Sequence, residues 1–389
     1  MHAINRAILA ACLLLCPVFA MAGEAEDFQK AKDEFEKGDR SKSFQLFKSL
    51  AEAGYQPAME EYAAEKDRNA EWEEALTYYR KLAEKNVAQA EYRIGVFYGL
   101  GHGVPQNNQE AVNWIMRAAD KDNKFAINTL VRAYLKQWAC ITLDPNSVSQ
   151  EKALAWLKRS AENEYVPALL AMADAYRKGA YGLPVDNEQA KALTAKADSI
   201  KNSFKMAEDG WARADFNVAN RTLEKLIEKD YAPAWSLLGY IADKIDFHEV
   251  GVGYYIHGAE QGYAEAQYLL AATFSSGQGV REDQVLAVEW LTRAAEMGYA
   301  NALKALPKNL IKIAASGQGG NLATDEKIVY WLKKAAAADD IDSVETLLDA
   351  YRTGKYGLTA DAQQIEQLQM VKDKLRPPKQ QKGKRKWMQ

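Results

Sequence analysis

The stretch of residues 266–302 constrains this chain most, because its pattern recurs along most of the sequence. It contains an apolar segment with helical spacing from Leu269 to Phe274, a glycine-rich turn that begins at Gly277, and a second apolar segment around Trp290. One such pair of helices cannot bury its own apolar faces and needs neighbours stacked on both sides. The sequence therefore predicts an all-α array of stacked helix pairs.

A small residue opens the first helix of each expected pair, and these residues count the repeats. The series is Ala58, Ala90, Ala126, Ala168, Ala234, Ala266, Ala302 and Ser343. The numbering rises in steps of 32, 36 and 42 and then, after a gap of 66, in steps of 32, 36 and 41. The numbers of Trp114 and Trp290 differ by 176, and those of Tyr176 and Tyr351 by 175. We therefore predict an α/α superhelical solenoid of about ten helix pairs, arranged as two duplicated five-repeat blocks over residues 23–203 and 204–375.

Bulky side chains recur on the apolar stripe of the second helices: Leu46, Tyr78, Trp114, Trp156, Tyr254, Trp290 and Trp331. Tryptophans at such spacing could stack on a ligand, but their place on the stripe favours core packing. Another expected core series lies four residues after each opening residue: Tyr62, Ile94, Leu130, Met172, Leu238, Leu270, Leu306 and Leu347. Longer insertions at residues 137–150 and 315–326 occupy equivalent points of the two blocks, where an interaction surface could have been added.

In the third and eighth units the chain resembles the Sel-1-like repeat family, a branch of the tetratricopeptide-like solenoids. The matching residues are Ala90, Ile94-Gly95, Tyr98, Gly101-His102-Gly103-Val104, Ala111, Trp114 and Ala118-Ala119, then Ala266, Gly277-Gln278-Gly279-Val280, Ala287, Trp290, Ala294-Ala295 and Gly298. The first, second, sixth and seventh units lack the Gly-x-Gly-Val turn, and the fifth and tenth keep little of the second-helix pattern. The resemblance implies an α-solenoid that binds proteins or assembles complexes and is not an enzyme.

Residues 1–22 have the pattern of a secretory signal peptide. His2 and Arg6 precede an apolar run over residues 7–19, and Ala20-Met21-Ala22 supplies the small residues that signal peptidase reads. A lipoprotein signal at Cys12 is the alternative, although few apolar residues precede that cysteine. No later stretch reaches the ~20 apolar residues that span a bilayer. We expect a mature chain that begins near Gly23, is periplasmic or secreted, and has no transmembrane segment.

The C-terminal segment, residues 376–389, carries six cations and no acid, whereas the whole chain has a net charge of −3. Pro377-Pro378 ends helical structure, and the segment is predicted to be a disordered basic tail. It could dock on an anionic envelope polymer, with Trp387 available at a membrane interface, or serve only as a solubilising end. A nucleic-acid partner is not indicated, because the body of the chain is acidic.

Few residues suggest chemistry. Gly-rich runs such as GLGHGV and SGQGG follow no predicted strand and lack the Gly-Lys-Ser/Thr of a nucleotide-binding loop. His102, His248 and His257 are interpreted as scattered, solvated residues, because no cysteine or carboxylate cluster completes a metal site. Cys140 is the one cysteine after the signal peptide and is expected to be a partly buried thiol without a redox role. We therefore predict no catalytic, cofactor or metal site.

The leading hypothesis is a periplasmic scaffold that holds a protein partner on a concave face formed by the first helices. The candidate contacts are first-helix residues outside the core series: Tyr92, Arg132, Asp174, Tyr240, Tyr268 and Lys308. Each of these side chains could instead simply cover apolar surface. The second hypothesis is an accessory of envelope or exopolysaccharide export, and the third, a hydrolase of envelope polymers, lacks a catalytic residue set.

Overall fold

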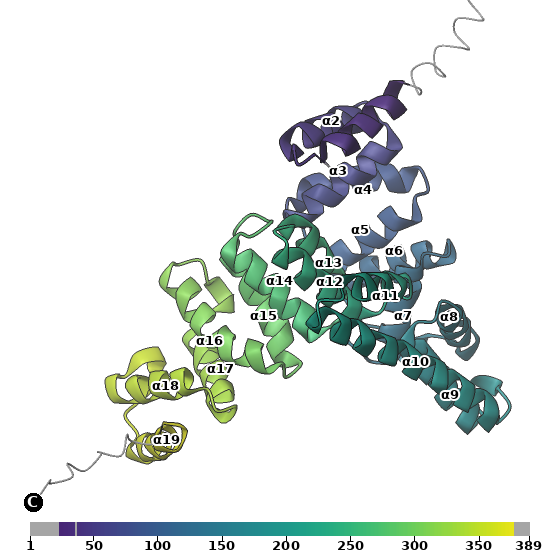
Figure 1. Ribbon diagram of the computed structural model, residues 1–389. Helices are drawn as coiled ribbons and strands as arrows, with labels where there is room; N and C mark the ends of the chain where they lie inside the picture. The colour runs from purple at the N-terminus through teal and green to yellow at the C-terminus, as the bar shows by residue number, and fades with distance from the viewer. Residues whose placement is uncertain (1–22, 36, 377–389) are drawn as a thin grey trace, which may run out of the picture. The chain divides into compact units, whose positions relative to one another are not determined.

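The computed structural model describes residues 23–35 and 37–376, and these residues form helices and turns with no strand. Residues 23–35 are helical and precede the labelled helices of Figure 1. These are α2 (Arg40–Glu52), α3 (Gln56–Arg68), α4 (Trp72–Glu84), α5 (Ala88–Leu100), α6 (Asn108–Asp120), α7 (Lys124–Tyr134), α8 (Gln150–Glu162), α9 (Val166–Lys178), α10 (Asn187–Ala212), α11 (Phe216–Glu228), α12 (Ala232–Lys244), α13 (His248–Glu260), α14 (Ala264–Ser276), α15 (Gln284–Glu296), α16 (Ala300–Ala315), α17 (Asp325–Ala337), α18 (Ile341–Thr353) and α19 (Ala362–Leu375). The short 3-10 helices are η1 (Pro145–Ser147), η2 (Ala180–Gly182), η3 (Gly320–Leu322) and η4 (Lys355–Gly357).

The chain divides into two compact units between Ala234 and Trp235, and each unit is described by itself. Within each unit, helices that follow one another in sequence pack on one another, as a solenoid of helix pairs requires. The predicted signal peptide, residues 1–22, and the tail beyond Arg376 lie outside the described residues. In the described part of the chain, no helix is both long and apolar enough to cross a membrane.

Local sequence explains where the helices begin and end. Asp39, Asn107 and Asp283 each accept a hydrogen bond from a backbone N–H in the first turn of the following helix, which is the usual role of an N-cap. Helix α14 is capped at its C-terminus by Gly277, whose φ of +71° costs glycine no steric strain. Gly279, in the same turn, lies so close to α13 that a Cβ atom there would be 2.4 Å from the carbonyl carbon of His248. The glycine-rich turn is therefore a packing contact between repeats.

The predicted core is confirmed at most positions. All eight opening residues are buried, from Ala58 at 0% exposed to Ser343 at 3%. Trp156, Trp290 and Trp331 are buried as well, which confirms core packing and contradicts a ligand-stacking series at these positions. Four residues of the predicted series are only partly buried: Leu46, Trp114, Leu238 and Tyr254. The Trp114 ring is covered on one side by the Arg117 guanidinium, 4.1 Å from the ring centroid.

Helix bounds repeat along the chain with the offsets seen in the sequence. Both bounds of α11 are numbered 176 higher than those of α2, and the same offset relates α3 to α12, α4 to α13, α5 to α14 and α6 to α15. An offset of 175 relates α8 to α17 and α9 to α18. Helix α10, however, is continuous over 26 residues and runs through the predicted block boundary at 203/204. The arrangement as two separate five-repeat blocks therefore stays a prediction.

The first of the two insertions packs onto its own unit. Cys140 and Ile141 are buried, so the thiol is more deeply buried than the partly buried one that the sequence predicted. Asn108 fixes the insertion to α6, because its side chain donates to the Thr142 carbonyl at 2.9 Å and accepts from the Thr142 N–H at 2.7 Å. Gly99 leaves room for this backbone, since a Cβ atom there would be 2.3 Å from the Cys140 carbonyl oxygen. The insertion thus packs against both α5 and α6.

Candidate functional site

The six predicted contact residues fall into two groups. Tyr92 is 4% exposed and Arg132 is 3% exposed, so these two side chains are internal, and their assignment to an accessible partner-binding face is corrected. The Asp174 side chain is 48% exposed and forms ion pairs with Arg177 and Lys178 in its own helix. The other three residues are in the second unit: Tyr240 is 39% exposed, Lys308 is exposed, and Tyr268 is partly buried.

A buried polar network in the first unit explains why Arg132 is not accessible. Its guanidinium donates to the Tyr165 hydroxyl at 3.0 Å and to the Thr129 hydroxyl at 2.9 Å. One helical turn earlier on α7, Asn128 donates to the carboxylate of Asp230 at 2.8 Å and accepts from the Ser160 hydroxyl at 2.5 Å. All of these side chains are buried, and Asp230 is only 1% exposed, so the network is closed to solvent.

The charges in this network stabilise one another. Burial alone lowers the pKa of Arg132, but the neighbouring Tyr165, Tyr92 and Asp230 more than offset this and raise it above its ordinary value. Burial also raises the pKa of the Tyr165 hydroxyl, although Arg132 beside it acts in the opposite direction. The arginine therefore stays charged, and the Asp230 carboxylate supplies the negative charge that a buried cation needs.

Asp230 lies in the turn between α11 and α12, which is far along the chain from α7 but packs against that helix. Its φ of +55° gives the turn a left-handed residue, which Asp tolerates better than most. Two further contacts hold this turn. Lys124 donates to the Glu228 carbonyl at 3.0 Å, and Lys229 pairs with Glu164. The first-helix face of α7 is thus covered by a segment of the same chain.

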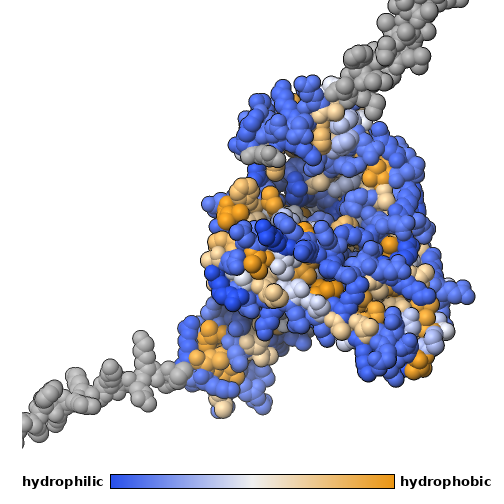
Figure 2. All heavy atoms as spheres, turned by 45° about the vertical axis from the view of Figure 1, so that its right-hand side comes forward, coloured by the Kyte–Doolittle hydropathy of each residue, from blue (hydrophilic) through white to orange (hydrophobic). Residues whose placement is uncertain are grey.

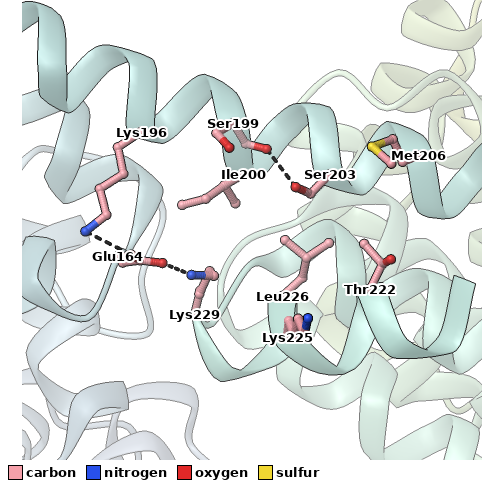
Figure 3. Close-up of a pocket in the computed structure, with 10 residues that line it drawn as sticks. All are labelled: Glu164, Lys196, Ser199, Ile200, Ser203, Met206, Thr222, Lys225, Leu226 and Lys229. Atoms are coloured by element: carbon pink, nitrogen blue, oxygen red, sulfur yellow. Dashed lines mark hydrogen bonds and ion pairs between the residues drawn. The ribbon is translucent and has the colours of Figure 1, made fainter. Parts of the chain in front are cut away.

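A cleft of about 400 Å³ lies beside this junction, between α10 and α11 (Figure 3). Its floor is apolar, with Ile200 at 4% and Leu226 at 2% exposed. Glu164 lies between two lysines, 2.9 Å from Lys196 and in contact with Lys229, as Figure 3 shows. These ion pairs hold the turn before α9 against α10 and α11, so most of the cleft's charge has a structural role.

A buried ion pair and hydrogen bonds from tyrosine hydroxyls also join neighbouring helices, and the sequence analysis did not predict them. Asp67 accepts from the Arg93 Nε at 2.9 Å and from the Tyr79 hydroxyl at 3.2 Å. In the second unit the corresponding Asp243 accepts from the Tyr255 hydroxyl at 2.8 Å. The numbers of Asp243 and Tyr255 are each 176 higher than those of Asp67 and Tyr79. This recurrence of both residues is the signal in the sequence that could have predicted the contact.

The histidines are not all solvated as predicted. His102 is 7% exposed and stacks on Trp72 with ring centroids 3.9 Å apart, so that interpretation is wrong for His102. His248 contacts Asp243 through Nδ1 at 3.1 Å, and His257 stacks on Trp235. Among the described residues, no group of three or more His, Cys, Asp or Glu side chains could hold a metal ion.

On the face drawn in Figure 2, hydrophilic residues predominate and hydrophobic ones form small, scattered groups. Single exposed apolar side chains are normal on soluble proteins and mark no site by themselves. The uncovered first-helix residues of the second unit therefore remain the candidate interaction site.

Comparisons with known proteins agree with the repeat pattern. The Sel1 repeat family model matches residues 33–55, 73–87, 88–123, 146–165, 166–197, 264–299 and 329–340. These segments include the third and eighth units, where the motif is most complete, and they occur in both compact units.

Two curated relatives come from Schizosaccharomyces pombe. Chitin synthase regulatory factor 2 is 30% identical over 106 residues, which are 27% of this chain and 20% of that protein. Chitin synthase regulatory factor 3 is 24% identical over 241 residues, which are 61% of this chain and 23% of that protein. The chain therefore matches less than a quarter of the length of either relative.

Solved structures give similar matches. A protective antigen of uropathogenic Escherichia coli with an SLR fold is 24% identical, covering 92% of this chain and 78% of that one, with a TM-score of 0.40. A Sel1 repeat protein from Oxalobacter formigenes is 23% identical, covering 78% of this chain and 89% of that one, with a TM-score of 0.34. The repeated motif, the stacked helix pairs and the family matches in both units show that this chain contains Sel1 repeats.

Proposed function

We propose that this protein is a non-enzymatic scaffold of the cell envelope, periplasmic or secreted, that holds a protein partner on the first-helix face of its second unit. Sel1 repeats mediate protein–protein interactions, which supports the scaffold role. The observation that carries the proposal is the difference in exposure between the units. Tyr92 and Arg132 are buried, whereas their counterparts Tyr268 and Lys308 and the neighbouring Tyr240 reach the surface.

Aromatic side chains at an accessible face suit this role, because they bury a large area on binding at a small cost in side-chain entropy. Tyr240 is 39% exposed and lies under the Lys244 ammonium, 4.9 Å from the ring centroid. This combination of a ring and a cation can accept an aromatic or an acidic group of a partner.

The partner face can be tested by photo-crosslinking in cells. Tyr240 is replaced with a photoreactive phenylalanine analogue in the full chain, and Tyr330 serves as the matched control. Tyr330 is the same residue type and 53% exposed, but it lies on a second helix, α17. We expect a discrete heterologous adduct from position 240 and none from position 330. Equal adducts at both positions, or none at 240, would refute the partner face.

The envelope location rests on the N-terminal sequence, where an apolar run over residues 7–19 precedes Ala20-Met21-Ala22. Cell fractionation with N-terminal sequencing of the mature chain tests it. We expect a chain that begins near Gly23 in the periplasm or the medium. An uncleaved chain in the cytoplasm would contradict this location.

A second candidate is an accessory role in the production or export of an envelope polysaccharide. The names of two relatives favour it, since both are regulatory factors of chitin synthase, an enzyme that makes a polysaccharide. Deletion of the gene should then lower the amount of surface polysaccharide, with restoration by the wild-type chain. Unchanged polysaccharide in the deletion strain would exclude this role and leave the scaffold proposal intact.

A further inference from the structure

The turn between α11 and α12 shows what one first-helix face of this chain recognises. Its two central side chains carry opposite charges and follow each other directly, Lys229 and then Asp230. Lys229 pairs with Glu164 in the turn before α9, and Asp230 is bound by Asn128 beside the buried Arg132 of α7. The face of α7 thus accepts a basic–acidic turn.

The second unit contains the equivalent face, with charged residues that the described part of the chain leaves uncovered. Lys304 and Lys308 of α16 occupy the positions of Asn128 and Arg132, and Asp339 occupies the position of Glu164. Asn128 is 1% exposed and Arg132 is 3% exposed, whereas Lys304, Lys308 and Asp339 are all exposed. We call these three residues, with the partly buried Tyr268 and Tyr299, the α16 face.

The tyrosines give this face an apolar floor. Their rings contact each other, with centroids 5.4 Å apart, and Tyr268 stands where the first unit has the buried Tyr92. Asp340 stands at the position equivalent to Tyr165 of the first unit. It is the N-cap of α18, where its side chain accepts a hydrogen bond from the Ser343 N–H at 3.0 Å, so it is not counted among the charges available to a ligand. The charges that the α16 face offers to a ligand are therefore two lysines and one aspartate.

We propose that the α16 face binds a helix–turn–helix segment of a partner protein whose turn presents a basic residue followed directly by an acidic one. The acidic side chain pairs with Lys304 and Lys308, and the basic side chain pairs with Asp339, as Asp230 and Lys229 do in the first unit. This inference rests on the proposed scaffold function and specifies the chemistry of its partner. Opposite charges in a fixed order select a partner as well as attract it.

In the described part of the chain, a second copy does not supply such a turn to the α16 face. Its own α11–α12 turn is already bound on α7. The counterpart of that turn lies between α2 and α3, where Ala53 and Gly54 stand in place of Lys229 and Asp230. Neither residue carries a charged side chain, so the pairing that the α16 face offers has no match there. Other turns in the described part of a second copy that carry a basic–acidic pair are already paired or have a different length. Lys121 and Asp122, between α6 and α7, pair with Glu91 and Arg159. Arg281 and Glu282 lie in the longer loop between α14 and α15. The occupant is for this reason a different protein.

The first experiment uses a peptide of residues 226–233, cyclised to hold the turn, and measures its binding to the full chain by fluorescence anisotropy. The control peptide has the same composition with Lys and Asp exchanged. We expect the native order to bind at least about fivefold more tightly, and the Lys304→Glu/Lys308→Glu variant to lose this preference. The Lys333→Glu variant, an exposed lysine of α17, should keep it. Equal binding of both peptides would count against the proposal.

The second experiment places the turn on the folded protein itself, so that the result does not depend on how well a peptide holds its shape. The Ala53→Lys/Gly54→Asp variant transplants the basic–acidic pair onto the α2–α3 turn. Gly54 has a φ of +90° and open space around it, and Asp tolerates a positive φ better than most residues. We expect this variant to self-associate in sedimentation velocity runs, and Lys304→Glu/Lys308→Glu to abolish the association. A variant that stays monomeric, together with equal peptide binding, would overturn the proposal.

Self-association of the wild-type chain that depends on Lys304 would also overturn it, because a second copy would then be the occupant. These outcomes are distinct from failure of the scaffold function. A partner crosslinked at position 240 in cells but insensitive to the α16 lysines would retain the scaffold and remove only this inference.

Discussion

The buried carboxylate of Asp230 gives the sharpest test of how the first unit is held together. Asp230→Asn keeps the size of the side chain and an oxygen that can accept from Asn128, which donates to the native carboxylate at 2.8 Å. It removes the negative charge and replaces one carboxylate oxygen with an NH2 group. Arg132, which is 3% exposed, would then retain hydrogen bonds to two neutral hydroxyls and lose the nearby anion.

Removing one partner from a buried charge pair typically costs about 3–5 kcal/mol, because the remaining charge stays in a poorly solvated place. Since the two hydroxyls still hydrogen-bond the guanidinium, we expect the lower end, about 3 kcal/mol. Arg132→Met removes the buried cation, and in that background Asp230→Asn should cost less than ~1 kcal/mol. The non-additivity isolates the charge–charge contribution.

Asp246→Asn is a matched control. Asp246 also lies in a turn between helices with a positive φ, +61° against +55° for Asp230, but its side chain is 95% exposed. The same substitution there should change stability by less than ~0.5 kcal/mol. Hydrogen exchange of the α7 and α11 amides reports the local opening free energy without assuming that a repeat array unfolds in one step. A loss below ~1 kcal/mol for Asp230→Asn would refute the role assigned to this carboxylate.

Four further outcomes are expected. Trp290→Ala truncates a ring that is only 2% exposed and should lower the free energy of unfolding in urea by about 3–5 kcal/mol. Trp114→Ala should lower it clearly less, because that ring is partly exposed, and equal losses would contradict this. Gly279→Ala should lower the thermal midpoint, because its Cβ would overlap the backbone of α13. Burial raises the pKa of Glu289, so the stabilising contribution of this side chain is present at low pH and is lost as the pH rises through that pKa. Glu289→Gln should therefore be more stable than wild type at about pH 7 and equal to it below about pH 4, as measured by pH-dependent melting. Deletion of residues 376–389 should weaken binding to anionic vesicles at low salt and leave the thermal midpoint nearly unchanged; salt-insensitive binding would exclude an electrostatic role.

Periodicity was enough to predict the helices and most of the core, because both depend on contacts between neighbours in sequence. The opening residue Ala126 and the core residue Leu130 are buried by helices within the same or the next repeat, and their spacing alone predicts this. The candidate contacts could not be sorted in the same way. Whether Arg132 faces solvent is decided by the turn at Asp230, far along the chain, and no local pattern carries that information.

The residue types at equivalent positions of α7 and α16 nevertheless differ according to whether another segment of the chain covers the helix. Where the α11–α12 turn covers α7, the chain has Arg132, whose planar guanidinium can satisfy several hydrogen bonds when buried. At the equivalent, exposed position of α16 it has Lys308, whose compact ammonium is better solvated by water. Likewise, the buried Asn128 of α7 has the exposed Lys304 as its counterpart in α16. Helix α16 has 16 residues against 11 in α7, but the two helices begin at equivalent positions, so these substitutions distinguish a face closed by its own chain from a face that keeps its charges available for another protein.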